Sequence, residues 1–476
     1  MAWTTVGQFG VQTINFGATL LLTLFLEPGD FGLVGFGFAV TAIVDMLVDF
    51  GTGAAIVQRR ELGARTVDIA FTISLLLALG ATLALVALGG ALAAIGGDWG
   101  EDAVLLWWLA PTCLFTAVAT MPRSLLTRTM RLDAIAKAML AAAIARAAAS
   151  LGAAATGAGA FSLVVGAYAG ALVLVLALRA YERTPLRLCW RSPERRELLA
   201  FGARLTAFNL VNTVLLNADA FVLTALLGKE AFGIFSLAKR LLLTPVDMAG
   251  NVARAVLFPA LAQVQNQRGR TRLLYVGADQ YMVAGMLPLL VGAALLVDLL
   301  TGSLLSASWA PVAPVALAML PAAVVTLLLQ SPGPLLLAHG RSGALLRWGT
   351  VRGLAMVLAF ALAPWLGLQG VVLAMGALVV LSLPWLLQDA SAVLGLRWPQ
   401  LCASLLAHAP AAAALAVAIL AVRQLLDGRL PPLALLAVAG GVGVAAFAAT
   451  LVVTRAPALH RVRHLLRQRR RRRSAR

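Results

Sequence analysis

Charged residues are scarce in this sequence of 476 residues: they make up 12% of it, whereas 61% is hydrophobic. Soluble domains are roughly one-quarter charged and one-half apolar, so the scarcity of charge excludes a soluble globular protein. Apolar runs such as Phe71–Ile95 and Ala158–Leu178 exceed the roughly 20 residues that a helix needs to cross a bilayer. The composition therefore predicts an all-α polytopic membrane protein. The first apolar stretch, which ends at Leu26, lacks the basic segment and cleavage site of a signal peptide, so we expect a retained helix.

Cysteine and histidine are also rare. The three cysteines, Cys113, Cys189 and Cys402, lie far apart and the four histidines are dispersed, so neither set has metal or redox spacing. The sequence contains no GxxxxGKS/T phosphate loop, and it assembles no nucleophile and base on one side of the membrane. These absences predict a protein that is not an enzyme and has no metal or cofactor. Coupling to an H+ or Na+ gradient stays open.

The hydrophobic segments predict about fourteen transmembrane helices, and the distribution of charge orients them. If the N-terminus is cytoplasmic, nearly all loop arginines and lysines fall on the cytoplasmic side, and the outer loops hold only Lys229, Arg423 and Arg429. Both termini are therefore predicted to be cytoplasmic. The predicted helices span residues 4–26, 31–57, 67–95, 103–122, 132–152, 157–179, 198–227, 231–258, 273–300, 311–338, 343–364, 367–388, 402–422 and 432–453.

A repeated turn indicates two related halves. Phe31-Gly32-Leu33 follows the first predicted helix, and Phe232-Gly233-Ile234 occupies the corresponding place in the second half. Six helices per half give both halves the same orientation, as in parallel transporter repeats. We therefore expect two six-helix lobes as parallel pseudo-repeats plus two C-terminal helices. The expected domains are an N-lobe at 1–180, a basic cytoplasmic linker at 181–197, a C-lobe at 198–396, two further helices at 397–454 and a basic cytoplasmic tail at 455–476.

Polar side chains form stripes on the first, second, seventh and eighth predicted helices, counted at about 100° per residue. Such stripes either join helices by hydrogen bonds or line a water-filled cavity, and the correspondence between two helix pairs favours a cavity. Asp45 and Asp49 could bind a proton or a cation, or pair with arginines. Arg240 and Arg254 could bind an anionic headgroup, or form a network with Asp247 that neutralises itself. The candidate substrate-binding residues are Gln8, Gln12, Asn15, Asp45, Asp49, Asn209, Asn212, Asp219, Arg240, Asp247, Asn251 and Arg254.

Two stretches carry a family resemblance. Residues 25–62, "FLEPGDFGLVGFGFAVTAIVDMLVDFGTGAAIVQRREL", resemble the start of polysaccharide and oligosaccharide flippases of the Wzx/WzxC type. Residues 209–265, from "NLVNTVLLNADAF" to "NVARAVLFPALAQVQ", are similar to the seventh and eighth helices of the same family. These flippases belong to the multidrug/oligosaccharidyl-lipid/polysaccharide (MOP) exporter superfamily. The resemblance covers about residues 1–400 and is only generic over the last two helices.

This resemblance implies a transporter rather than an enzyme. Its substrate would be an undecaprenyl-diphosphate-linked oligosaccharide, a repeat unit of capsule, exopolysaccharide or O-antigen. It would move by alternating access across the bacterial inner membrane, through a cavity lined by the four striped helices. Asp49, Asp219, Arg240 and Arg254 match polar cavity positions of the family.

Two other functions stay open from the sequence. One is a cation-coupled multidrug or metabolite antiporter of the same superfamily, and the other is a scaffold in an envelope-assembly complex. The expected partners are the lipid-linked oligosaccharide, anionic lipids at the arginine-rich tail and a polysaccharide polymerase. Much of the formal charge of +18 lies in that tail, and nothing else resembles a nucleic-acid module, so no nucleic-acid partner is expected.

Overall fold

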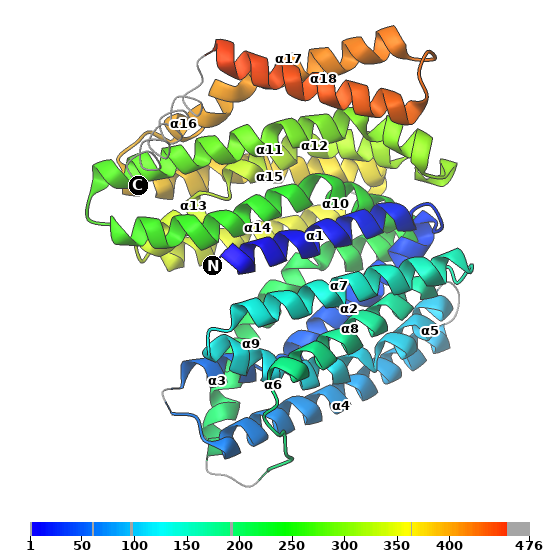
Figure 1. The fold of residues 1–476 in the computed structure, drawn as a ribbon, viewed down its shortest axis with the longest axis vertical. Coiled ribbons are helices and arrows are strands. Elements are labelled where there is room, and N and C mark those ends of the chain that lie inside the picture. Colours follow the sequence, from blue (N-terminus) through cyan, green and yellow to red (C-terminus); the bar gives the residue numbers. More distant parts are fainter. Residues whose placement is uncertain (1, 60, 96–98, 191–193, 363, 455–476) are drawn as a thin grey trace, which may run out of the picture. The chain divides into compact units, whose positions relative to one another are not determined.

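The computed structural model describes residues 2–59, 61–95, 99–190, 194–362 and 364–454. The predicted tail at 455–476 lies outside these residues. Every regular element in the described part of the chain is a helix, which confirms the all-α prediction (Figure 1). Within these described ranges, twelve helical segments are long and apolar enough to cross a membrane, and a shorter apolar helix spans Phe9–Leu22. The count of fourteen is not confirmed.

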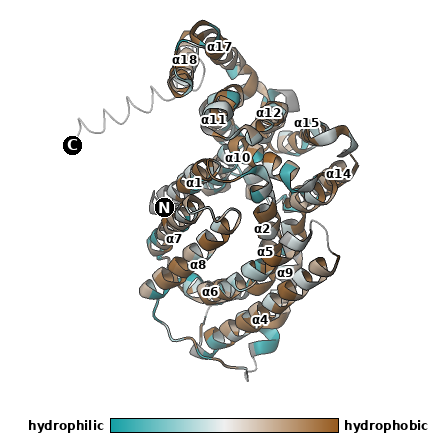
Figure 2. Ribbon diagram, turned by 90° about the vertical axis from the view of Figure 1, so that its right-hand side faces the viewer, coloured by the Kyte–Doolittle hydropathy of each residue, from teal (hydrophilic) through white to brown (hydrophobic). Residues whose placement is uncertain are grey.

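The chain divides into two compact units, Met1–Gly233 and Ile234–Arg476. The boundary predicted at 181–197 stays a prediction. In the first unit, α7 packs antiparallel to α8, α1 lies against α7, and α4 lies against α5 and α6. Hydrophobic residues prevail along α2 and α4, as Figure 2 shows. The elements of this unit are α1 (Ala2–Leu22), α2 (Pro28–Asp49), α3 (Thr52–Gln58), α4 (Ala64–Ile95), α5 (Trp99–Leu109), α6 (Thr112–Arg128), α7 (Leu132–Ala155), α8 (Phe161–Tyr181), α9 (Glu194–Leu216) and the start of α10 (Ala218–Gln263).

In the second unit, α11 contacts α12, α17 and α18, and α15 packs against both α12 and α14. Figure 1 shows α17 and α18 as a hairpin. The elements after α10 are α11 (Arg268–Leu304), η1 (Ala307–Trp309), α12 (Val312–Leu328), α13 (Pro332–Ala338), α14 (Ser342–Leu362), η2 (Pro364–Leu366), α15 (Gly367–Leu394), α16 (Trp398–Leu401), α17 (Ala403–Leu426) and α18 (Pro432–Val453).

Four of the predicted helices are interrupted within the described residues. The helix predicted over 103–122 is divided between α5, which ends at Leu109, and α6, which begins at Thr112. The helix predicted over 311–338 is divided between α12, which ends at Leu328, and α13, which begins at Pro332. The prediction of one continuous helix over 31–57 is wrong, because α2 ends at Asp49 and a separate helix, α3, begins at Thr52. Phe50 (φ 44°) and Gly51 (φ 63°) between them adopt left-handed backbone conformations, which interrupt the right-handed helix. The helix predicted over 198–227 is likewise divided at Asn217, which separates α9 from α10.

The repeated turns lie where the sequence places them. Pro28 opens α2, where its missing N–H costs no hydrogen bond, and the backbone N–H of Glu27 donates to Asp30 at 3.1 Å. The second turn is a kink inside α10 at Gly228, whose φ of 86° strongly favours glycine. Each turn therefore ends one helical segment and starts another.

Candidate functional site

A polar cavity of about 440 Å³ lies in the first unit, between the end of α2, α3 and α6. Asp49, one of the predicted residues, is half-buried in its wall. Arg123 and Gln58 are exposed at the same cavity, so it opens to the outside of the unit. Its lining residues are Asp49, Gly53, Ala54, Val57, Gln58, Thr120, Arg123, Ser124 and Thr127.

The break after α2 shapes this cavity. Thr52 is buried: its hydroxyl donates to the carbonyl oxygen of Asp49 at 2.7 Å and lies 2.9 Å from the Ser74 hydroxyl. These bonds fix the turn that starts α3. Gly53 then faces α6, where an added Cβ would lie 2.7 Å from Ser124 Oγ and 3.3 Å from Asp49 Oδ1. A residue without a side chain therefore keeps this part of the cavity open.

Basic side chains surround the cytoplasmic end of α3, on the predicted orientation. Arg123 interacts electrostatically with Asp49. Arg128 donates to the carbonyl oxygens of Ile56, at 2.8 Å, and Arg59, and so satisfies acceptors at the end of α3. Arg59 forms an ion pair with Glu197 at 2.8 Å. The cavity thus combines one carboxylate with hydroxyl, amide and guanidinium groups.

The other predicted residues of the first unit do not share this cavity. Asp45 faces α6, where it hydrogen-bonds to Thr116, and its buried Oδ1 has no hydrogen-bond partner among the residues that the structure describes. Asp219 is buried at the start of α10. The half-buried residues Gln12 and Asn15 lie on α1, and Asn209 is half-buried on α9. The side chains of Gln8 and Asn212 lie outside the described part of the chain.

A cationic cluster lies in the second unit, on α10 and α14. Asp247 is exposed and interacts electrostatically with Lys239, Arg254 and Arg352. Asn251 supplies its side-chain oxygen to Arg254 Nη2 at 2.6 Å, which orients that guanidinium. Three cations around one carboxylate leave an excess of positive charge. The alternative of a self-neutralising network of Arg240, Asp247 and Arg254 does not account for Lys239 and Arg352.

Sequence analysis missed two members of the cluster, Lys239 of α10 and Arg352 of α14. Arg352 is the one on a helix that contributed no predicted site residue. It lies at the centre of α14, its guanidinium carbon is 5.1 Å from the centre of the Trp348 ring, and its Nε is buried without a hydrogen-bond partner among the described residues. Burying an arginine in the middle of an apolar membrane-length helix costs free energy, so such a residue is a functional candidate. The sequence therefore contained a signal for Arg352. Arg240 is exposed one turn before Thr244, on the same side of α10 as Asp247.

The cavity residues of α6 were also missed. Arg123, Ser124 and Thr127 lie beyond 122, where the predicted helix ended, whereas α6 continues to Arg128; Thr120 lies inside the predicted helix but was not selected. The signal for them is the spacing of Thr116, Thr120, Ser124 and Thr127, which places four hydroxyls along one face of a helix. No cluster of three or more His, Cys, Asp or Glu side chains suited to a metal ion occurs among the described residues.

Comparison with known sequences gives a consistent group. A family profile described as "Polysaccharide biosynthesis protein" matches residues 21–314. The succinoglycan biosynthesis transport protein ExoT of Rhizobium meliloti is 24% identical over 364 residues, which are 75% of this chain and 72% of the relative. The lipopolysaccharide biosynthesis protein WzxC of Escherichia coli is 22% identical over 273 residues, which are 57% of this chain and 55% of the relative.

Two solved structures share the fold. The lipid II flippase MurJ in an inward closed conformation superposes with a TM-score of 0.75 and 11% identity, over 96% of this chain and 99% of that structure. An inward-facing multidrug resistance MATE transporter of the MOP superfamily gives a TM-score of 0.63 and 17% identity, over 80% of this chain and 95% of that structure.

Proposed function

Because the chain belongs to the polysaccharide biosynthesis protein family, we propose that it is a flippase that moves a lipid-linked oligosaccharide across a bacterial inner membrane. The relative ExoT is named as a transport protein of succinoglycan biosynthesis, which supports a transporter rather than an enzyme. The resemblance to flippases of the Wzx/WzxC type, seen in residues 25–62 and 209–265, agrees with this family.

The substrate we propose is an oligosaccharide on undecaprenyl diphosphate, a repeat unit of capsule, exopolysaccharide or O-antigen. The observation that carries this proposal is the cationic cluster of Lys239, Arg254 and Arg352 around Asp247. A positive side chain within an apolar helix costs free energy, so its presence there indicates a functional role. Guanidinium groups pair well with phosphate oxygens, because their planar donors match two acceptors at once. A diphosphate would offset the excess charge.

The mechanism we propose is alternating access. The diphosphate would contact the cationic cluster while Asn and Gln side chains bond sugar hydroxyls, and the polyprenyl chain would stay in lipid. The single cavity that the sequence predicts between the two halves belongs to this proposal. So does coupling to an H+ or Na+ gradient, for which Asp45 and Asp49 are the candidates in the first unit. Cytoplasmic termini, anionic lipids at the tail and a polymerase partner are proposed on the sequence pattern alone.

The alternative of a multidrug or metabolite antiporter fits the cluster less well, since an excess of positive charge disfavours a cationic drug. A scaffold without transport would need no excess charge at all. The cluster therefore favours an anionic lipid-linked substrate over both alternatives.

The test replaces Arg352 or Arg254 with Ala, singly and together, and measures glycan at the outer leaflet in cells that lack another copy of the gene. We expect export to fall at least about tenfold in the double variant, since each arginine is worth one to two charge-assisted hydrogen bonds. Arg347→Ala is the matched control, because Arg347 is an exposed arginine of the same helix. Normal export by the double variant at normal protein level would contradict the proposal.

A further inference from the structure

A buried carboxylate joins three elements of the second unit. Asp279 lies on α11 and is 3% exposed. Ser331, between α12 and α13, donates its hydroxyl to Oδ1 at 2.8 Å, and Ser404 of α17 donates its hydroxyl to Oδ2. Each carboxylate oxygen therefore receives one donor from an element distant in sequence. This arrangement is distinct from both polar sites described above.

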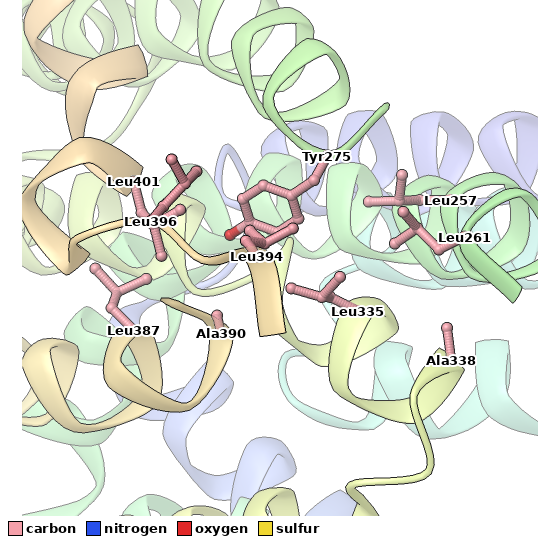
Figure 3. Packing of buried hydrophobic residues seen from close by; sticks show 10 residues of the cluster. All are labelled: Leu257, Leu261, Tyr275, Leu335, Ala338, Leu387, Ala390, Leu394, Leu396 and Leu401. Carbon is pink, nitrogen blue, oxygen red and sulfur yellow. The ribbon is translucent and has the colours of Figure 1, made fainter. Parts of the chain in front are cut away.

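The surroundings provide no positive charge for this carboxylate. Tyr275 lies one turn earlier on α11 and is 2% exposed, and Figure 3 shows it among leucine side chains that include Leu394, Leu396 and Leu401. Among the described residues, the titratable groups that interact with Asp279 are Tyr275 and Cys402, and neither carries positive charge. An ionised carboxylate without a cation is costly in an apolar interior, even with two hydroxyl donors.

The elements around this site carry other charged groups, among them Arg272 of α11 and Arg397 after α15, but the interactions that the structure shows for Asp279 include none with these groups. His408 lies one turn after Ser404 on α17 and is fully buried; its Nδ1 lies 2.6 Å from the Ser404 carbonyl oxygen, and its Nε2 has no hydrogen-bond partner within the described residues. His339 follows α13, and Asp389 lies on α15. The segment of α10 packed here contributes Leu257 and Leu261. A ligand that neutralises Asp279 must therefore be small, because large side chains fill the space around it.

A second polar anchor shows what the site does for the fold. Arg423 of α17 forms an ion pair with Asp298 of α11 and donates to the Leu295 carbonyl oxygen at 2.7 Å. Both helices advance from the Ser404–Asp279 bond to this ion pair in the same direction, so they are parallel. At about 1.5 Å per residue the two anchors are roughly 28 Å apart, which is the thickness of the hydrocarbon core. Asp279 thus fastens one end of the α17–α18 hairpin and Arg423 fastens the other.

We propose that Asp279 binds one small monovalent cation, a proton or Na+, and that occupancy of this site docks the α17–α18 hairpin onto α11. A proton would convert the carboxylate to a neutral acid that exchanges hydrogen bonds with Ser331 and Ser404. Na+ would take the carboxylate oxygens and the two serine hydroxyl oxygens as ligands, which are the hard oxygen donors that such a cation prefers. In both cases one positive charge neutralises a buried carboxylate. This binding does not depend on the lipid-linked substrate proposed above.

The test measures the thermal unfolding of the purified full-length chain in detergent, between pH 5 and 8, with Na+ or with N-methylglucamine chloride at equal ionic strength. If a proton is bound, the wild type unfolds at least about 2 °C higher at pH 5 than at pH 8 in either salt. If Na+ is bound, the same increase appears at pH 8 on addition of Na+. In Asp279→Asn the amide is neutral at every pH, so both dependences are lost. Asp389→Asn is the matched control and keeps the dependence of the wild type.

Ser404→Ala keeps the proposal testable if Asp279→Asn does not fold. Loss of a hydroxyl donor destabilises the ionised carboxylate. If a proton is bound, the midpoint of the dependence of the unfolding temperature on pH therefore moves to higher pH. In the sodium case the half-saturating Na+ concentration increases several-fold, because one ligand is lost. A wild type whose unfolding depends on neither pH nor Na+, or an Asp279→Asn or Ser404→Ala variant with unchanged dependence, would overturn the proposal.

Discussion

Gly32 of α2 lies against the backbone of Lys229: a Cβ added to Gly32 would fall 1.7 Å from the Lys229 carbonyl oxygen. The contact is reciprocal, since a Cβ on Gly233 would fall 1.8 Å from the carbonyl oxygen of Pro28. Pro28 and Lys229 stand four residues before the glycines Gly32 and Gly233 in the two repeated turns. The turns that looked alike in sequence therefore cross each other with backbone against backbone.

Gly32→Ala should destabilise this crossing strongly. A methyl group cannot avoid a backbone carbonyl by changing a rotamer, so the two segments must move apart, at a cost of about 1–3 kcal/mol or more. We expect a lower unfolding temperature and reduced export. Gly29→Ala is the control, because a Cβ at Gly29 meets nothing within 4 Å. Equal behaviour of the two variants would show that the crossing does not matter for stability.

Gly53→Ala should narrow the cavity of the first unit. The new Cβ would lie 2.7 Å from Ser124 Oγ, closer than real contacts allow. We expect reduced export and a loss of about 1–2 kcal/mol in the free energy of unfolding. Ser124→Ala removes the opposing oxygen, so the double variant should recover part of the loss. A double-mutant cycle measures this coupling, and additive effects would argue against the contact.

Asp279→Asn should also alter the thiol of Cys402. Burial and the nearby Asp279 carboxylate raise the pKa of this thiol above its ordinary value. Removal of the negative charge lowers the pKa, so the thiolate fraction at a given pH increases. With Cys113 and Cys189 replaced by Ala, the rate of alkylation at pH 8 should rise by about 2–5-fold, since a shift of one pKa unit is a factor of ten. The full pH profile separates a shifted pKa from a change in exposure, which would alter the rate equally at all pH values.

Asp247→Asn should increase the affinity of the second unit for phosphate-bearing lipid. The change removes the carboxylate that competes for Lys239, Arg254 and Arg352. Since Asp247 is exposed, we expect the variant to fold. Binding of undecaprenyl diphosphate to purified protein should tighten several-fold at low salt and less at high salt, because ions screen the interaction. Weaker binding would indicate that Asp247 positions the arginines instead.

Hydropathy predicted the helical segments well, because every backbone group in a bilayer must be bonded within a helix. It failed at Phe50 and Gly51, where a segment without proline contains a left-handed break and only Gly51 indicates it. Helical phase placed Asp49, Asp247 and Arg254 at polar sites, because those residues belong to unbroken stretches of α2 and α10.

Other features depend on long-range packing that one sequence does not reveal. The partners of Asp279 are Ser331 and Ser404, which are 52 and 125 residues away, and no local pattern associates them. The electrostatic interaction between Arg352 and Asp247 relates α14 to α10, which are separated in sequence by α11, α12 and α13. In both cases the sequence showed a polar residue in an apolar helix but could not show its partner.

The C-terminal hairpin lies beyond residue 314, where the family profile ends, and its sequence is only generically similar to the family. This could suggest that it is dispensable. Its Ser404, however, completes the hydrogen bonding of a carboxylate that belongs to α11. A chain that ended at Leu394 would leave Asp279 with one hydrogen-bond donor fewer. The last two helices therefore stabilise a buried carboxylate that belongs to the preceding part of the second unit.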